Sequence, residues 1–180
     1  MKEFKPLLLF LARFLGTYII LSLAYKLYLD QYLPHNNPDP FTKLTSDITA
    51  FGLNKCGFFS FSNIAENHPW MRLVVDGQVA SIVNEGCNAI SILIIFVSFI
   101  VAFYTNFKQT FLFILSGLAI LFVMNISRIM LLNYIFRYHA EYGKMAHDYL
   151  FPAIIYGSIV ILWIVWIKFF VTKYNKRNAK

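Results

Sequence analysis

Residues 72–92 read RLVVDGQVASIVNEGCNAISI, and the rest of the chain is organised around this stretch. An Asp-Gly pair between two apolar runs is a strong short-range signal for a β-hairpin, so Asp76-Gly77 predicts a tight turn. The second run passes directly into a long apolar segment that predicts a helix. Cys87 lies at this junction, which puts a thiol at the mouth of an apolar helix.

The composition indicates a membrane protein. Of the 180 residues, 58% are apolar, against about 45–50% in ordinary globular domains. The excess lies in a few long runs, which is typical of membrane spans. The net charge is +7, with the basic residues clustered at the two ends of the chain. No basic-aromatic platform accompanies them, so we expect the lipid bilayer as a partner and no nucleic acid.

Four apolar segments are predicted to span the membrane: about 7–29, 88–104, 110–136 and 149–171. About 20 helical residues cross a hydrocarbon core of about 30 Å. The first segment also resembles a signal peptide, but Arg13 interrupts the apolar run, so an uncleaved span is preferred. The third is longer than the bilayer needs, and its far end is expected to project beyond it.

Residues 30–86 form the only long polar region. Four apolar residues recur in it with helical spacing: Phe41, Leu44, Ile48 and Phe51. This pattern predicts an amphipathic helix at the membrane surface. The predicted fold is therefore an all-α multi-pass membrane protein, one integral domain over residues 1–180. It has about four transmembrane helices, the amphipathic helix, and a short β-hairpin before the second span.

The distribution of charge predicts the orientation. Basic residues gather in the first few positions, in the 106–109 turn and in the tail at 173–180. The positive-inside rule then puts both termini on the cytoplasmic side of the cytoplasmic (inner) membrane. Residues 30–86 and a short polar connection at 137–148 are expected on the outer, extracytoplasmic side.

This topology brings three unusual residues to one level at the outer face. Cys87 opens the second span, Arg128 lies in the outer part of the third, and His147 precedes the fourth. An ionisable residue inside a span is costly and suggests a function, which favours Arg128. Alone, Cys87 is compatible with a small buried residue and His147 with an interfacial one. Their convergence favours a site.

The three residue types suit acyl transfer. A cysteine nucleophile reacts as its thiolate, which a helix N-terminus and nearby cations stabilise. We expect Cys87 to attack a carbonyl, His147 to accept or relay its proton, and Arg128 to stabilise the developing oxyanion. The intermediate would be a thioester on Cys87.

Four neighbouring residues are predicted to support this set. Asn125 lies three residues before Arg128 on the same helical face and is expected to hold it. Asp148 is expected to cap the fourth span, whose N-terminus would keep His147 neutral. Glu85 opposes a thiolate unless it points away or orients another group. Asn88 begins a row of small or polar residues that offers either internal packing or a face for a client helix: Asn88, Ser91, Ser98 and Ala102.

The two cysteines leave one alternative open. Cys56 and Cys87 are both predicted outside, where a disulfide between them would remove the nucleophile. The Cys and His residues lack ligand spacings such as CxxC or HxxxH, and no phosphate-binding loop is present. We therefore expect neither a metal ion nor another cofactor.

Three short segments, in this order, resemble a known family: 84–89 (NEGCNA), 125–129 (NISRI) and 146–148 (AHD). They are similar to the exosortase/archaeosortase family, most of all to its short exosortases of the Bacteroidota type. The resemblance covers roughly residues 74–157 and implies Cys87, Arg128 and His147 as the catalytic set. It further implies a membrane transpeptidase for client proteins whose C-terminal sorting signal has a short motif, a transmembrane helix and a basic end.

The sequence therefore predicts a membrane-embedded cysteine endopeptidase or transpeptidase. It would cleave the sorting signals of exported, membrane-anchored clients and transfer the clients to an acceptor through Cys87. A different class of function is a non-catalytic membrane subunit of an export or surface-assembly complex, with Arg128 as a structural pin. A third is a small-solute transporter with Arg128 in an anion path.

Overall fold

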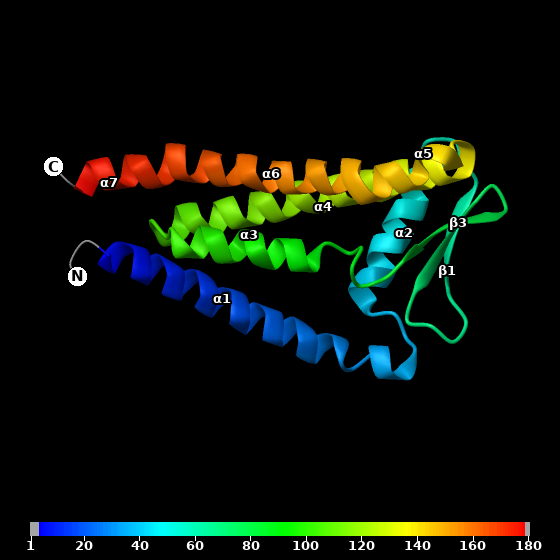
Figure 1. The fold of residues 1–180 in the computed structure, drawn as a ribbon, viewed down its shortest axis with the longest axis horizontal. Helices are drawn as coiled ribbons and strands as arrows, with labels where there is room; N and C mark the ends of the chain where they lie inside the picture. The colour runs from blue at the N-terminus through cyan, green and yellow to red at the C-terminus, as the bar shows by residue number, and fades with distance from the viewer. Residues whose placement is uncertain (1–3, 179–180) are drawn as a thin grey trace.

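A computed structural model describes residues 4–178 of the chain. It is an elongated helical bundle with a small sheet at one end and both chain ends at the other (Figure 1). Lys2 and Lys180, which contribute to the charge pattern used for the predicted orientation, lie outside the described residues.

The elements follow one another as helices broken by one sheet. The helices are α1 (Lys5–Leu29), α2 (Pro40–Lys55), α3 (Ile90–Ala102), α4 (Phe107–Tyr138), α5 (Ala140–Met145), α6 (Phe151–Val165) and α7 (Thr172–Asn178). A 3₁₀ turn, η1 (Leu33–His35), and two π-helical segments, η2 (Ala146–Leu150) and η3 (Trp166–Val171), lie between them. The strands are β1 (Ser60–Ile64), β2 (Met71–Val75) and β3 (Gln78–Val83).

Three helical stretches within residues 4–178 are long and apolar enough to cross a membrane: Leu7–His35, Phe107–Tyr138 and Ala140–Tyr174. The predicted membrane protein with several apolar helices is thus confirmed, but the count of four spans is not. The segment predicted at 88–104 forms only the 13 residues of α3. At about 1.5 Å per residue this is about 20 Å, less than a hydrocarbon core of about 30 Å.

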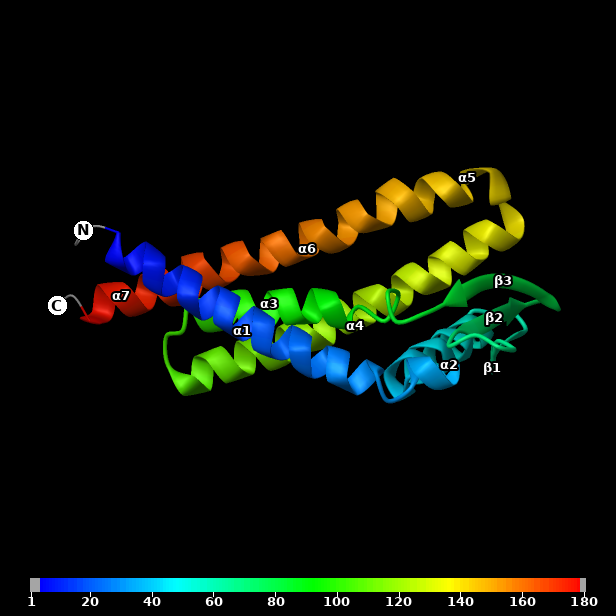
Figure 2. The ribbon, with the colours of Figure 1, turned by 60° about the horizontal axis from the view of Figure 1, so that its bottom comes forward.

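The backbone before each helix determines where α3 and α4 begin. Ala89 has a left-handed backbone (φ 67°), so α3 begins only at Ile90, whose main-chain N–H donates to the side-chain oxygen of Asn88 (2.9 Å). The side-chain oxygen of Asn106 accepts the N–H of Gln109 (3.0 Å) and starts α4 soon after α3 has ended. In Figures 1 and 2, α4 continues past the start of α3 toward the sheet.

The polar connection predicted at 137–148 is mostly helical, so the last long helical stretch begins at Ala140 and not near residue 149. The chain turns at His139 and resumes as a helix at Ala140, continuing through α5, η2, α6, η3 and α7 to Asn178. Close packing permits this, because Gly143 lies against the ring of Phe136; a Cβ added at Gly143 would lie 2.4 Å from that ring. α4 and the helix that begins at Ala140 therefore both extend beyond the apolar segments of the sequence. The polar residues there gave no indication of a helix.

The predicted hairpin is confirmed. β2 and β3 are antiparallel, and the Asp76-Gly77 turn has two positive φ angles, 47° and 79°, as a type I′ turn requires. β1, which the sequence analysis missed, pairs with β2 to give a three-stranded sheet of order β1-β2-β3. The fold is thus mostly helical with a small sheet, and not all-α.

One core cluster joins the sheet to α2 and α4: Ala50, Met71, Leu73, Val83 and Ile129, with Cys87 packed against it. The helix predicted from Phe41 to Phe51 is confirmed as α2, and its buried face combines Ala50 and Leu53 with small polar residues. Thr45, Ser46 and Thr49 are buried and donate to carbonyls one turn earlier. Leu44 and Phe51 are 48% and 62% exposed, which leaves the apolar face turned away from the protein.

Candidate active site

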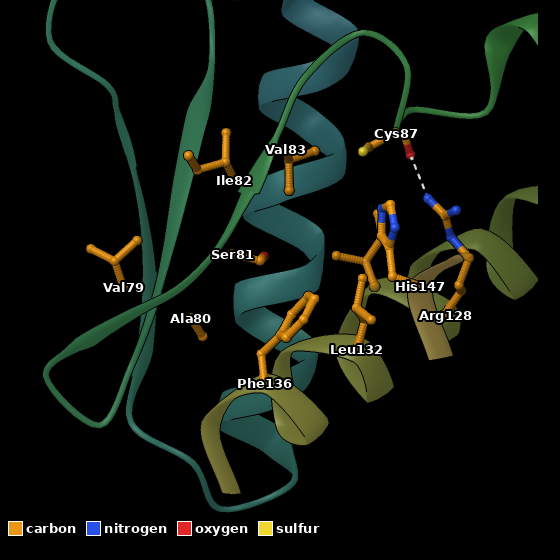
Figure 3. A pocket seen from close by; sticks show the side chains of 11 residues that line it. Val79, Ala80, Ser81, Ile82, Val83, Cys87, Arg128, Leu132, Phe136 and His147 are labelled. Atoms are coloured by element: carbon orange, nitrogen blue, oxygen red, sulfur yellow. Dashed lines mark hydrogen bonds between the residues drawn. The ribbon is translucent and has the colours of Figure 1, made fainter. Parts of the chain in front are cut away.

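A pocket of about 420 Å³ at the sheet end of the bundle gathers the three residues predicted as the catalytic set. It is lined by residues 79–83 of β3, by four side chains of α4 that include Arg128, by Cys87 and by His147. In the view of Figure 3, the His147 imidazole is drawn beside the hydrogen bond that joins Arg128 to the Cys87 carbonyl. The predicted convergence therefore exists, while the chemical role of each residue stays a prediction.

Cys87 sits on a tight turn between β3 and α3. Its N–H donates to the carbonyl of Asn84 (2.9 Å), and the Asn84 side chain accepts the N–H of Gly86 (3.1 Å). Because α3 begins only at Ile90, Cys87 precedes the helix and does not open it. The thiol is free and partly buried, and in Figure 3 its sulfur points to the β3 side of the pocket while its carbonyl points to Arg128.

Two side chains of α4 hold the main chain at Cys87. The Asn125 amide donates to the Cys87 carbonyl at 2.9 Å, and the Arg128 guanidinium donates to the same oxygen at 3.4 Å. Asn125 and Arg128 thus share the Cys87 carbonyl as an acceptor, and the predicted support of Arg128 by Asn125 stays a prediction. Within residues 4–178 Arg128 has no carboxylate partner, and its Nε is buried without a hydrogen bond. The guanidinium thus keeps donors for another acceptor.

His147 lies inside a helix, in the π-helical segment η2. Because that helix begins at Ala140, the predicted cap by Asp148 is wrong, and the argument from a helix N-terminus does not apply. Instead, His147 Nδ1 and Asp148 Oδ1 are 2.8 Å apart. A carboxylate only accepts hydrogen bonds, so Nδ1 of His147 is the donor, and Nε2 is free to contact other groups. The pair is 53% and 40% exposed, so it orients the ring more than it stabilises the fold.

Residues 7–170 match the family model described as transmembrane exosortase. The chain belongs to the transmembrane exosortase family. This confirms the resemblance found in the sequence, and the matched range includes Cys87, Arg128 and His147. Exosortases are membrane-embedded enzymes that process sorting signals, and the family is generally one of cysteine peptidases and transpeptidases. Comparisons with curated proteins and with solved structures gave no match.

In this exosortase, Asn88 faces away from the pocket and anchors the Cys87 turn to two other helices. Its buried amide donates to the hydroxyls of Tyr25 on α1 (2.9 Å) and Thr42 on α2 (3.1 Å). Thr42 in turn donates to Asp39, whose carboxylate caps α2. Sequence reasoning missed Tyr25 and Thr42. Asp39 before Pro40 signalled a helix start, but no sequence signal pointed to Tyr25.

Glu85 does not line the Cys87 pocket of the exosortase. It borders a different pocket of about 360 Å³, together with Tyr25 and Lys26 of α1 and Ser91 of α3. One of its carboxylate oxygens is buried without a hydrogen-bond partner among residues 4–178. Its charge therefore faces α1, and the conflict with a Cys87 thiolate that the sequence suggested is reduced.

The remaining expectations concern α3 and Cys56. Three residues of the predicted row, Asn88, Ser98 and Ala102, are buried and pack internally. The fourth, Ser91, is exposed and borders the same pocket as Glu85. Cys56, which follows the last residue of α2, is exposed, whereas Cys87 is partly buried. Both thiols are free, so the two cysteines do not form a disulfide. Among residues 4–178, no three His, Cys, Asp or Glu side chains come together in a way that would hold a metal ion.

Proposed function

We propose that this exosortase is a cysteine endopeptidase or transpeptidase whose nucleophile is Cys87. The observation that carries the proposal is the single pocket bordered by Cys87, Arg128 and His147, with His147 bonded to Asp148. A thiol, a base with a fixed tautomer and a guanidinium with free donors are the groups that acyl transfer through a thioester needs.

The proposed cycle begins with proton transfer from the Cys87 thiol to Nε2 of His147. The sulfur attacks a client peptide carbonyl, and N–H groups of Arg128 donate to the oxyanion that forms. The C–N bond then breaks, and the departing amine takes the proton from His147. This releases the C-terminal signal and leaves the client as a thioester on Cys87. An acceptor amine or water, deprotonated by His147, attacks the thioester and returns Cys87 to the thiol.

Catalytic hydrogen bonds are often longer before substrate binds than in the reactive complex. Within residues 4–178, the structure has no hydrogen bond between the Cys87 sulfur and His147. The bond from Arg128 to the Cys87 carbonyl is also long, at 3.4 Å. Both are compatible with a resting site in which the substrate carbonyl completes the set of contacts.

The clients we propose are membrane-anchored proteins whose C-terminal sorting signal contains an apolar helix. A groove of about 210 Å³ between α4 and α6 supports this, because Arg128 lines both the groove and the Cys87 pocket. The rest of the groove is largely apolar and is lined by Val123, Met124, Ser127, Leu131, Phe151 and Ile154. A client helix in the bilayer would therefore lie next to the guanidinium while its scissile bond reaches the thiol.

We further propose that both termini are cytoplasmic in the inner membrane, with α3 as a short fourth crossing and the pocket on the outer face. The arrangement in Figure 1 supports this, with both chain ends opposite the sheet. Lys108 in the first turn of α4 and Lys173 in α7 lie at that end, as the positive-inside rule requires of a cytoplasmic side.

A non-catalytic subunit is the second candidate, and one observation favours it. Asn125 and Arg128 both donate to the main-chain carbonyl of Cys87, as side chains with a purely structural role would do. In that case Arg128→Ala would lower the abundance of the protein without any effect specific to processing.

The deciding experiment expresses Cys87→Ser and His147→Ala variants in the host and follows protein abundance and client processing together. We expect both variants to be abundant and neither to process clients. Normal processing by Cys87→Ser would refute the proposal. Trapping of an acylated Cys87 and identification of the attached peptide by mass spectrometry would identify the client.

A further inference from the structure

The sheet has two edges, and only one of them opens onto the Cys87 pocket. β1 is the far edge, and there the Asn54 side chain of α2 accepts the N–H of Ser60 (3.0 Å) and donates to its carbonyl. β3 is the near edge, and its residues 79–83 line the pocket. Within residues 4–178, no hydrogen bond joins the main chain of residues 79–83 to any segment except β2. A row of main-chain groups therefore borders the candidate active site without a partner.

The register identifies a residue that presents its main chain to the pocket side. The N–H of Asp76 donates to the carbonyl of Phe59 (2.8 Å), so Asp76 faces β1. Main-chain groups of a strand alternate between its two neighbours, so Arg72, four residues earlier, also faces β1. Arg72 is the register partner of Ile82 on β3. The N–H and C=O of Ile82 therefore point away from β2, toward the open edge.

We infer that the client's recognition segment binds as an added strand along the open edge of β3. The inference rests on the proposed function, since it assumes that a peptide carbonyl must reach Cys87. Strand addition is a general mode of peptide recognition, in which main-chain hydrogen bonds give affinity and side-chain pockets give specificity. The occupant is an extended peptide, and its main chain bonds to the N–H and C=O of Ile82.

The surroundings of β3 suit an extended peptide. The strand leads directly into the turn that carries Cys87, so a peptide that follows β3 arrives at the thiol. α4 supplies apolar surface beside the strand through Leu132 and Phe136, which line the pocket. The Ser81 hydroxyl donates to Asn133 at 2.8 Å and ties β3 to α4. Alternate side chains of an added strand would pack on this apolar surface, which favours clients with apolar residues at every second position.

The direction of the added strand follows from the chain path. β3 runs from the Asp76-Gly77 turn toward Cys87 and α3. A client runs from its exported part toward its own membrane helix, and so travels the same way. The added strand is therefore parallel to β3. In a parallel pair, the N–H and C=O of one residue bond to two different residues of the neighbour. Only every second peptide N–H of the client then takes part in the pairing.

The test uses a probe with no recognisable side chains, acetyl-tetraalanine chloromethyl ketone, together with the four peptides that are N-methylated at one alanine each. The full-length exosortase in detergent is treated with each peptide, and the rate of Cys87 alkylation is measured by mass spectrometry. Chloroacetamide, which is too small to pair with a strand, reports the intrinsic reactivity of the thiol. The quantity compared is the ratio of the peptide rate to the chloroacetamide rate.

We expect N-methylation to lower this ratio about fivefold at alternate positions, the effect of one lost main-chain hydrogen bond, and to have little effect at the positions between them. Equal tolerance of N-methylation at all four positions would overturn the inference. Ile82→Pro removes the outward N–H at a site where an edge strand tolerates proline, and should lower the ratio similarly. Ser62→Pro is the matched control, because Ser62 has the same outward position on β1 and should leave the ratio unchanged.

The two proposals fail separately. Alternation in the peptide rates depends only on how a peptide lies along β3 and requires no catalysis. If Cys87→Ser still processes clients while the alternation is found, the proposed function is wrong and strand addition stands. If processing depends on Cys87 but the ratio is insensitive both to N-methylation and to Ile82→Pro, strand addition is wrong.

Discussion

Gly143→Ala should damage the candidate site from a position outside the pocket. The Cβ that this substitution adds would lie 2.4 Å from the ring of Phe136. Ordinary contacts of this kind begin at 3.4 Å, so the ring or α5 must move by about 1 Å to restore normal van der Waals distance. Phe136 lines the pocket, and His147 follows Gly143 by one helical turn. Either movement therefore changes the position of the base relative to Cys87.

A misplacement of about 1 Å can cost about a hundredfold in rate, whereas overpacking usually costs about 1–3 kcal/mol of stability. We expect client processing by Gly143→Ala to fall between tenfold and a hundredfold, while the protein remains folded. The assay follows the conversion of client precursor to product on a gel, normalised to the amount of exosortase. The double variant Gly143→Ala with Phe136→Leu removes part of the ring and should recover most of the activity.

Gly157→Ala is the matched control, because nothing lies within 4 Å of a Cβ added at Gly157 in α6. Both substitutions improve helix propensity by up to about 1 kcal/mol, so only the clash distinguishes them. Wild-type activity in Gly143→Ala, or an equal loss in Gly157→Ala, would refute the reasoning from close packing.

Three further substitutions test individual contacts. Asp148→Asn keeps the size of the side chain but no longer fixes the tautomer of His147, and should slow client processing at least about tenfold with unchanged abundance; an unchanged processing rate would contradict this role. Asn125→Ala removes the 2.9 Å hydrogen bond to the Cys87 carbonyl and should lower the free energy of unfolding by about 1–3 kcal/mol. Thermal unfolding in detergent measures this, and an unaltered melting temperature would argue against the bond. Thr42→Val breaks the link between Asn88 and Asp39 and should lower the melting temperature, while Lys43→Ala on the same helix should not.

The parts of the fold that could be predicted depend on local chemistry. The hairpin was predictable because Asp76-Gly77 favours a turn that few other residue pairs adopt. The joint position of Cys87, Arg128 and His147 followed from the alternation of apolar segments across a bilayer, although one of those segments is shorter than expected. The family was recognisable because these three residues occur in short, characteristic surroundings.

The parts that could not be predicted depend on contacts distant in the sequence. The helical connection after His139 was missed because polar residues look alike in helices and loops, and the packing of Gly143 on Phe136 joins residues of two different helices. The contact of Asn88 with Tyr25 spans 63 positions. The choice of Asp148 as a partner of His147 depended on where the helix starts, and that start was placed too late.

The π-helical turn at Ala146–Leu150 lies within one continuous helix, which runs from Ala140 to Asn178, and rotates the part after the turn relative to the part before it. An α-helix advances about 100° per residue, and a π turn accommodates an extra residue without breaking the helix. On one side of the turn the helix directs Gly143 at Phe136, and on the other it directs Ile159 into the cluster with Phe96 and Leu121. The rotation introduced by the π-helical turn allows Gly143 and Ile159 to contact their different neighbours at the same time. Insertion or deletion of one residue in this turn would rotate Gly143 relative to Ile159 by about 100°. The helix could then keep its contact with Phe136 or its contacts in the Phe96 cluster, but not both, and His147 would be displaced with it.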